Sequence, residues 1–250
     1  MMNSIKSLYR FLLPYEKRFW LYKLRNREDF MKLRREVNPS AKGNFSLRRY
    51  DEYRCIFIHI TKTAGTSVAT AFFDELPYHY TAVQYRVIFG RRNFNQYFKF
   101  AFVRNPWDRL YSAWNFLKQG GWDEKDAAWA AGHLGHIDDF NEFVCQWMNE
   151  ERLWSHIHFW PQYRFIEDHK GRCLLDHIAY FETIHQDFEV IASRLGIKTT
   201  LPHKNPSRRS DYRDIYSGEA RDKVARLYAR DIDKLGYSFD GFEKRQPWKK

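Results

Sequence analysis

Two short apolar runs in the first half of the chain are each followed by a polar loop and then by a segment with helical spacing. The first run is Cys55 to Ile60 (CIFIHI), its loop is Thr61 to Ser67, and helix-like spacing continues from Val68 to Leu76. The second run is Tyr97 to Val103 (YFKFAFV), which ends at Arg104-Asn105-Pro106 before a further helical pattern. The chain therefore contains two successive strand-loop-helix units.

Strands that are apolar throughout are typical of a parallel sheet buried on both faces. Two such units in series predict an α/β fold in which a central parallel sheet is flanked by helices, as in P-loop-like proteins. Ile178 to Phe181 is a candidate further strand. Asp138 to Met148 and Glu219 to Leu235 are predicted to be amphipathic helices.

A basic segment with helical spacing precedes this core. Residues 4–36 carry apolar residues at helical intervals, interrupted by Pro14, and predict two short amphipathic helices. Asn38 to Asn44 is predicted to be a linker, because Pro, Gly, Asn and Ser dominate it. We expect a basic helical N-terminal arm with its linker over residues 1–44 and one α/β domain over residues 45–250.

The composition fits a globular protein, since 44% of the 250 residues are hydrophobic and 29% are charged. No apolar run approaches the ~20 residues of a membrane span, and the N-terminus lacks the apolar stretch of a secretory signal. The three cysteines, Cys55, Cys145 and Cys173, are widely spaced and odd in number, which favours a reducing compartment and argues against a zinc site. We therefore expect a cytoplasmic protein.

The net charge of +11 lies at the two ends of the chain: residues 1–54 carry +8, residues 55–197 carry −3 and residues 198–250 carry +6. Such an excess suits an anionic ligand, an anionic membrane surface or nucleic acid, and it also suits solvated terminal helices. No RNP, helix-turn-helix or zinc-finger pattern accompanies the charge, so we do not expect a nucleic-acid partner. Peripheral membrane contact through the basic ends stays open.

The first loop has the composition of an anion site. Its backbone N–H groups would lie at a helix N-terminus, Gly65 permits close approach, and Lys62 adds a cation. It is not a Walker A loop, because there the lysine follows the second glycine, whereas Lys62 precedes Gly65 by three residues. The alternative is a polar helix cap with an incidental lysine.

The second loop suggests another anion site. Arg104 closes a strand, Asn105 and Pro106 suit the start of the next helix, and Ser112 lies about two turns later on the side of the loop. The alternative for Arg104 is an ion pair with Asp108. Loops that follow neighbouring parallel strands meet at one edge of the sheet, so the pair predicts a ligand with two anionic groups.

These segments resemble the carbohydrate sulfotransferases that use 3′-phosphoadenosine 5′-phosphosulfate (PAPS), both Golgi-type and bacterial. IFIHITKTAGTS (Ile56 to Ser67) is similar to their 5′-phosphosulfate loop, and KFAFVRNPWDRLYSAW (Lys99 to Trp114) to their 3′-phosphate motif. Three later segments also match: His158 to Gln162, Ile178 to Glu182 and Tyr228 to Phe239. The resemblance covers roughly Arg54 to Phe239. Thr61 stands where members commonly have proline, and the N-terminal anchor of Golgi members is not evident.

The resemblance implies a sulfotransferase that moves the sulfuryl group of PAPS to a carbohydrate hydroxyl by in-line displacement, without a metal. Lys62 would neutralise charge on the bridging oxygen, and Arg104 and Ser112 would hold the 3′ phosphate. The residues implied to hold the 5′ phosphosulfate are Lys62, Thr63, Ala64, Gly65, Thr66 and Ser67. The acceptor would be a polysaccharide, a lipid-linked glycan or a glycoside.

A hydroxyl acceptor requires a general base, for which histidine suits neutral pH. His79 is the candidate, because family members also have a histidine between the two nucleotide loops, and His158 is the second choice. We interpret Asp123 to Asp126 as a solvated helix start, and His203 to Arg209 as a basic loop near the nucleotide. Two other functions stay open: a phosphotransferase with a nonstandard phosphate loop, and a basic module that binds glycans or nucleic acid.

Overall fold

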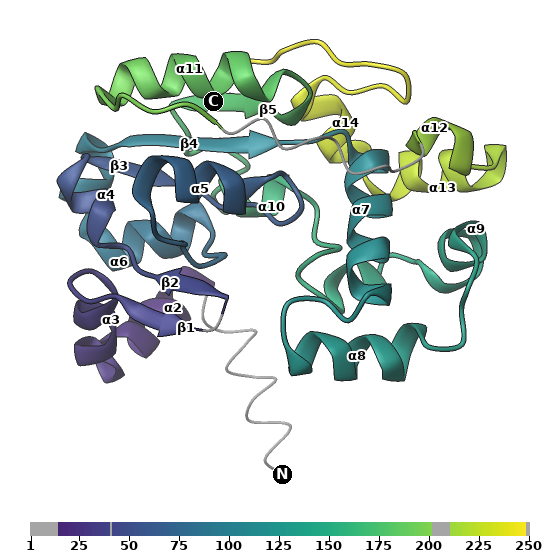
Figure 1. Cartoon of the computed structure of the whole chain (residues 1–250), viewed down its shortest axis with the longest axis horizontal. Coiled ribbons are helices and arrows are strands. Elements are labelled where there is room, and N and C mark those ends of the chain that lie inside the picture. Colours follow the sequence, from purple (N-terminus) through teal and green to yellow (C-terminus); the bar gives the residue numbers. More distant parts are fainter. Residues whose placement is uncertain (1–14, 41, 202–210, 249–250) are drawn as a thin grey trace.

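A three-stranded parallel sheet forms the centre of the molecule (Figure 1). The computed structural model describes residues 15–40, 42–201 and 211–248. The strand order is β3 (Cys55–Phe57), β4 (Phe98–Val103) and β5 (His177–Tyr180). All of β3 is buried, and so are β4 and β5 after their first residues. The continuous apolar runs therefore predicted the parallel sheet correctly, although β3 ends three residues earlier than its run.

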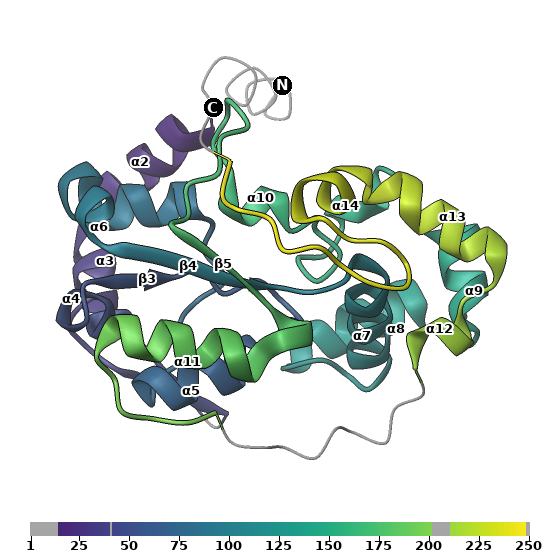
Figure 2. The same cartoon turned by 90° about the horizontal axis from the view of Figure 1, so that it is seen from above.

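Helices cover both faces of this sheet (Figure 2). One face carries α6 (Ala82–Gln96), α10 (Tyr163–Ile166) and α14 (Ala229–Leu235), and the other carries α5 (Gly65–Phe73) and α11 (Ile184–Leu195). Phe72 of α5 and Phe188 of α11 stack with their ring centroids 4.1 Å apart. The short helix α4 (Arg48–Glu52) leads into β3. The predicted α/β architecture is confirmed.

A second group of helices packs around α7 (Pro106–Lys118), which continues from the end of β4. Asn105 caps α7 by accepting a hydrogen bond from the Trp107 N–H, and Pro106 occupies the first helical position. The other members are α8 (Glu124–Leu134), α9 (Phe140–Glu142), the π-helix η1 (Phe143–Trp147), α12 (Tyr212–Ile215) and α13 (Gly218–Leu227). Short 3₁₀ turns, η2 (Arg152–Trp154) and η3 (Phe181–Thr183), complete the connections. These helices share their own apolar cluster beside the sheet.

The amphipathic α-helix predicted over residues 138–148 is wrong, because Phe143–Trp147 in the second half of the segment form a π-helix. Asp139 caps a helix that starts only at Phe140, and from Phe143 the chain widens into the π-helical η1. This winding places Phe143, Val144 and Trp147 together in the apolar cluster. The helix predicted over residues 219–235 is divided into α13 and α14 at Tyr228, whose buried hydroxyl donates to the Phe159 carbonyl.

The segment predicted to be a linker is a hairpin instead. Its strands, β1 (Asn38–Ser40) and β2 (Gly43–Phe45), pair antiparallel, and the Ser40 hydroxyl donates to the Gly43 carbonyl. The Leu76 N–H donates to the Asn44 carbonyl, and the Ser46 N–H donates to the Leu76 carbonyl. Turn residues are common to linkers and hairpins, so only these long-range bonds distinguish the two.

Two helices lie within the predicted N-terminal helical segment, α2 (Tyr15–Arg25) and α3 (Arg27–Leu33). Phe19 and Phe30 are buried, and both belong to the same apolar cluster as the sheet. The part of that segment before Tyr15 lies outside the described residues. Over the part of the chain that the structure describes, no helix is both long and apolar enough to cross a bilayer.

The stacked pair across α5 and α11 gives a test of the packing. Phe188 is 1% exposed, so Phe188→Ala should lower the free energy of unfolding by about 3–5 kcal/mol, because it removes buried apolar surface and leaves a cavity. Val190, on the same helix, is 55% exposed, and Val190→Ala should change it by less than about 0.5 kcal/mol. Urea denaturation measures both. Equal effects of the two substitutions would contradict this packing.

Candidate active site

The loop between β3 and α5 has an unusual backbone. Lys62 and Ala64 both have positive φ, 65° and 61°. The hydroxyl of Thr63, the residue between them, donates to the Ile60 carbonyl. At Gly65 a side-chain carbon would lie 2.0 Å from the His59 ring, so only glycine fits where α5 begins. The first N–H groups of a helix have no partner within it. The loop thus presents those groups beside Lys62, as an anion cradle requires.

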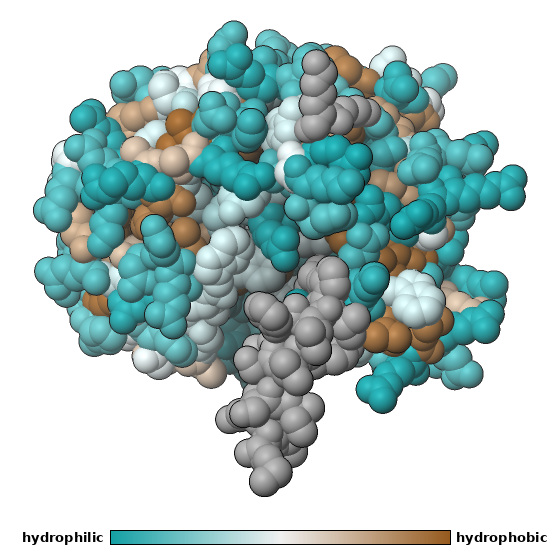
Figure 3. Space-filling model, turned by 180° about the vertical axis from the view of Figure 1, so that it is seen from behind, coloured by the Kyte–Doolittle hydropathy of each residue, from teal (hydrophilic) through white to brown (hydrophobic). Residues whose placement is uncertain are grey.

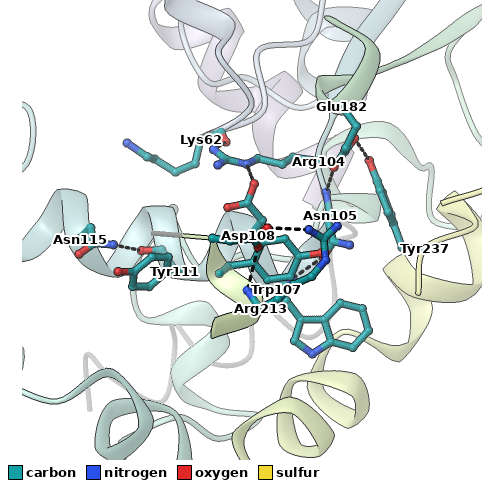
Figure 4. Close-up of polar contacts among 12 residues, drawn as sticks. Lys62, Arg104, Asn105, Trp107, Asp108, Tyr111, Asn115, Glu182, Arg213 and Tyr237 are labelled. Carbon is teal, nitrogen blue, oxygen red and sulfur yellow. Dashed lines mark hydrogen bonds and ion pairs between the residues drawn. The ribbon is translucent and has the colours of Figure 1, made fainter. Parts of the chain in front are cut away.

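The loop between β4 and α7 touches this first loop through Arg104 (Figure 4). The Arg104 guanidinium donates from Nη1 to the Lys62 carbonyl at 3.0 Å and from Nε to Asp108 at 2.7 Å. It also lies 4.1 Å from the ring centroid of Phe181. The ion pair with Asp108, given above as the alternative to an anion site at Arg104, is therefore present. Arg104 itself is buried.

Glu182 and Asn105 hold the second loop in place (Figure 4). The Asn105 N–H donates to Glu182 at 2.7 Å, and the Tyr237 hydroxyl donates to the same carboxylate at 3.0 Å. Burial raises the pKa of Glu182 above its usual value. Ser112 is buried in α7, one turn after Asp108. Arg104 and Ser112 are the two candidates for binding the 3′ phosphate, and no contact between them is found among the described residues.

One cavity of about 330 Å³ lies beside the first loop. It is lined by Lys62, Gly65 and Thr66 from that loop and by both candidate histidines, His79 and His158. Apolar side chains form most of its remaining wall: Phe45, Leu76, Pro77, Phe116, Trp122 and Ile157. The structure thus brings together the three residues proposed for catalysis. Arg104 and Ser112 do not line this cavity.

Lys62 reaches the cavity wall that α7 provides. Its Nζ lies 3.7 Å from the ring centroid of Phe116, which is cation–π distance. The aromatic face stabilises the ammonium group without neutralising it. Lys62 therefore contributes a positive charge at the junction of the first loop and the cavity.

His79 is held in one tautomer by the backbone. Its Nδ1 lies 2.7 Å from the His59 carbonyl oxygen, and since a carbonyl can only accept, Nδ1 carries the proton. The other nitrogen, Nε2, then has a free lone pair in the neutral ring. Burial lowers the pKa of His79 below the ordinary histidine value, and the nearby Lys62 charge acts in the same direction. His79 is thus a neutral acceptor of protons at neutral pH.

His158 is held differently. Its Nε2 lies 3.9 Å from Asp126, its ring packs edge-on to Phe116, and its buried Nδ1 has no partner among the described residues. Burial lowers the pKa of His158 to about 4. His158 is therefore also neutral at neutral pH, but its Nε2 faces a carboxylate. Of the two histidines, His79 has the geometry better suited to a base.

The interpretation of Asp123 to Asp126 as a solvated helix start is wrong for Asp126. This carboxylate lies 3.3 Å from His156 Nε2, accepts the Trp122 N–H at 2.8 Å and faces His158. The His158 contact lowers the pKa of Asp126, so the carboxylate stays ionised. Its two histidine partners lie some thirty residues further along the chain, and the His156-x-His158 pair is the only sequence signal that indicates them.

Arg109 was also missed from the sequence. Its guanidinium is fully buried and donates to the carbonyls of His158 and Trp160 and, at 3.4 Å, to the Thr61 hydroxyl. Its position in the helical pattern of the sequence does not distinguish this buried arginine from one exposed on the surface. Within the described residues, no group of three or more His, Cys, Asp or Glu side chains is placed to hold a metal ion. The basic loop His203 to Arg209 lies outside the described residues.

Comparison with known proteins agrees with this arrangement. The model of the sulfotransferase family matches residues 46–238, which include both loops, the cavity histidines and the Arg109 contacts. No curated protein and no solved structure matches the chain significantly. The match confirms the family resemblance, favours neither the phosphotransferase nor the binding module, and indicates an enzyme that transfers a sulfuryl group. The chain belongs to the sulfotransferase family.

Proposed function

We propose that this enzyme transfers the sulfuryl group of PAPS to a hydroxyl group of a carbohydrate. The observation that carries the proposal is the shared cavity, which the loop residues Lys62 and Thr66 line together with His79 and His158. A donor held by the loop and an acceptor held in the cavity would meet at Lys62. This is the arrangement that direct transfer between two bound molecules requires.

The residues present fit a nucleotide with phosphates at both ends. The glycine-only position at Gly65 and the two positive-φ residues before α5 suit the 5′ phosphosulfate, with Thr66 and Ser67 adding hydroxyl donors. Arg104, tied to the Lys62 carbonyl, suits the 3′ phosphate, and Ser112 extends that site along α7. When bound, PAPS supplies the activated sulfuryl group.

Lys62 and His79 then have complementary roles. Lys62 stabilises the negative charge that develops on the bridging oxygen as the sulfur–oxygen bond breaks. His79 accepts the proton of the acceptor hydroxyl on Nε2 as the hydroxyl oxygen bonds to sulfur. The His59 carbonyl keeps the imidazole in the required tautomer throughout. His158 and Asp126 also line the cavity.

The cavity wall favours a sugar ring as the acceptor. Phe45 and Trp122 offer apolar ring faces, while Asp123 and Asp126 offer carboxylates that accept hydrogen bonds from hydroxyl groups. This mixture of apolar walls and a few polar groups is typical of small-molecule sites. In-line displacement follows if donor and acceptor bind on opposite sides of the sulfur atom.

Transfer from isotopically labelled PAPS onto a panel of glycans and glycosides, read by mass spectrometry, tests the function. Thermal shifts with adenosine 3′,5′-bisphosphate, ATP and an oligonucleotide test the donor class separately. We expect stabilisation by the bisphosphate alone. Stabilisation by ATP in its place, without sulfate transfer, would contradict the proposal.

Arg104→Ala should weaken binding of adenosine 3′,5′-bisphosphate by about 1.5–3 kcal/mol, the range of a charge-assisted hydrogen bond. Adenosine 5′-phosphosulfate lacks the 3′ phosphate and should bind almost as before. Arg194 provides a matched control, since it also stacks on a phenylalanine, Phe98, but at the opposite end of β4. Isothermal titration calorimetry measures the affinity of each nucleotide for the parent, for Arg104→Ala and for the control Arg194→Ala. Equal losses for both nucleotides would show that Arg104 does not recognise the 3′ phosphate.

Lys62→Ala should lower kcat by about 10²–10³-fold with a smaller change in donor affinity, because the charge that it stabilises grows mainly in the transition state. Lys42 is the control: its Nζ lies 5.5 Å from the Trp122 ring at the same cavity, and Lys42→Ala should leave kcat close to the parental value. Steady-state rates and bisphosphate affinities distinguish the roles. A Lys62 variant with unchanged kcat and weak donor binding would reduce Lys62 to a binding residue.

His79→Ala should lower kcat by about 10²–10⁴-fold and leave bisphosphate affinity nearly unchanged, as expected for loss of a general base. The base must be unprotonated, and its pKa is lowered, so the rate of the parental enzyme should fall only at pH values below histidine's ordinary ~6.5. Rate measurements across pH test both statements. If His158→Ala abolishes transfer and His79→Ala does not, the base is His158; activity in both variants excludes both histidines.

A further inference from the structure

We propose that the surface formed by α2 and α3 binds anionic lipid bilayers. Large apolar side chains that are exposed to solvent concentrate there. Across the described residues, seven such side chains are exposed, and five belong to these two helices: Trp20, Leu21, Tyr22, Leu24 and Met31. Their exposed fractions run from 36% to 57%. The other two, Trp154 and Val190, lie far apart in the sequence.

Three of the four exposed apolar residues of α2 form a stripe along its outer side, and Tyr22 lies off this stripe. Trp20, Leu21 and Leu24 follow Lys17 at positions three, four and seven, which lie on one face of a helix. The inner side is occupied: Phe19 is buried against Phe30, with ring centroids 5.6 Å apart. A typical surface helix has one apolar face directed to the core, so this second stripe requires a separate explanation.

Contacts with α6 fix the orientation of α2. Lys23 donates to the carbonyls of Val87 and Ile88, and Glu16 pairs with Arg86 at 2.8 Å. These bonds hold α2 from its first turn to its last. The outer stripe is therefore a rigid feature of the folded chain, and a bilayer could bind it without rearrangement of the helix.

The charge around the stripe matches an anionic surface. Between Lys17 and Glu36 the exposed basic residues outnumber the exposed acidic ones by five to three. The acidic ones are Glu28, Asp29 and Glu36, and the basic ones are Lys17, Arg25, Arg27, Lys32 and Arg35. Near an anionic membrane each such cation contributes about 1 kcal/mol of attraction. Trp and Tyr side chains favour the boundary between lipid and water, and leucines enter the acyl region. Basic residues with an apolar stripe are the pattern of an interfacial helix.

Figure 3 shows the same mixture on the face that carries α2 and α3, where apolar atoms lie among hydrophilic ones on the right of the view. A second copy of this chain fits less well, because a two-fold contact would bring two copies of the same basic surface together. Nucleic acid would satisfy the cations but would leave Leu21 and Leu24 without an apolar partner. The bilayer accounts for both kinds of side chain.

Co-sedimentation of the full chain with vesicles tests the proposal, using phosphatidylcholine alone and phosphatidylcholine mixed with phosphatidylglycerol. We expect binding to the mixed vesicles, weakened by salt, and none to phosphatidylcholine alone. The double variant Trp20→Ser/Leu24→Ser should lower the partition coefficient about tenfold or more, because it removes apolar surface without changing charge. The matched control Trp154→Ser/Val190→Ser removes one exposed tryptophan and one exposed aliphatic residue elsewhere and should bind as the parent does.

Absence of binding to the mixed vesicles, or equal binding by both double variants, overturns the proposal. So does a change from dimer to monomer in Trp20→Ser/Leu24→Ser without a change in vesicle binding, which would make this surface an interface between copies. Sulfate transfer to a soluble acceptor should be the same in the parent and in Trp20→Ser/Leu24→Ser. The outcome is therefore independent of the proposed function.

Discussion

The fully buried guanidinium of Arg109 is the contact on which the cavity depends. It reaches from α7 to the Thr61 hydroxyl beside the first loop and to the carbonyls of His158 and Trp160. Burying a cation costs several kcal/mol unless its donors are satisfied. The two carbonyls and the hydroxyl accept from Nη1 and Nη2, whereas the buried Nε has no partner among the described residues, so these bonds offset the cost in part and only when the three segments are in register. Arg109 thereby fixes the distance between the donor loop and the histidine side of the cavity.

The cavity lies where two apolar clusters meet. The first loop, α5 and the hairpin belong to the sheet cluster, whereas Phe116 and the segment of α8 that holds Asp126 belong to the helical group around α7. The two loops proposed to bind the donor follow the ends of β3 and β4, and the sheet fixes the positions of those ends. The wall proposed to face the acceptor draws on both clusters, because Phe45 and Trp122 pack against the sheet cluster while Phe116 packs against the other.

Local sequence patterns correctly predicted the features that depend on neighbouring residues, namely strands and helix starts. The apolar runs gave β3 and β4, and Asn105-Pro106 marked the start of α7 because a cap and a missing N–H act within a few residues. Lys62, His79 and His158 were candidates from the resemblance, and the structure brings them to one cavity. Asp126 and Arg109 were missed because their partners are distant in the chain. The hairpin of residues 38–45 was missed because its composition equally suits a linker.

Phe45 has a consequence for how the family can diversify. It lines the cavity from the end of β2, one residue before the region that matches the sulfotransferase family begins. One ring of the proposed acceptor wall thus lies just upstream of the matched region. On the proposed function, replacing the segment that ends at Phe45 would change the surface offered to the acceptor and leave the sequence of the two loops after β3 and β4 unaltered.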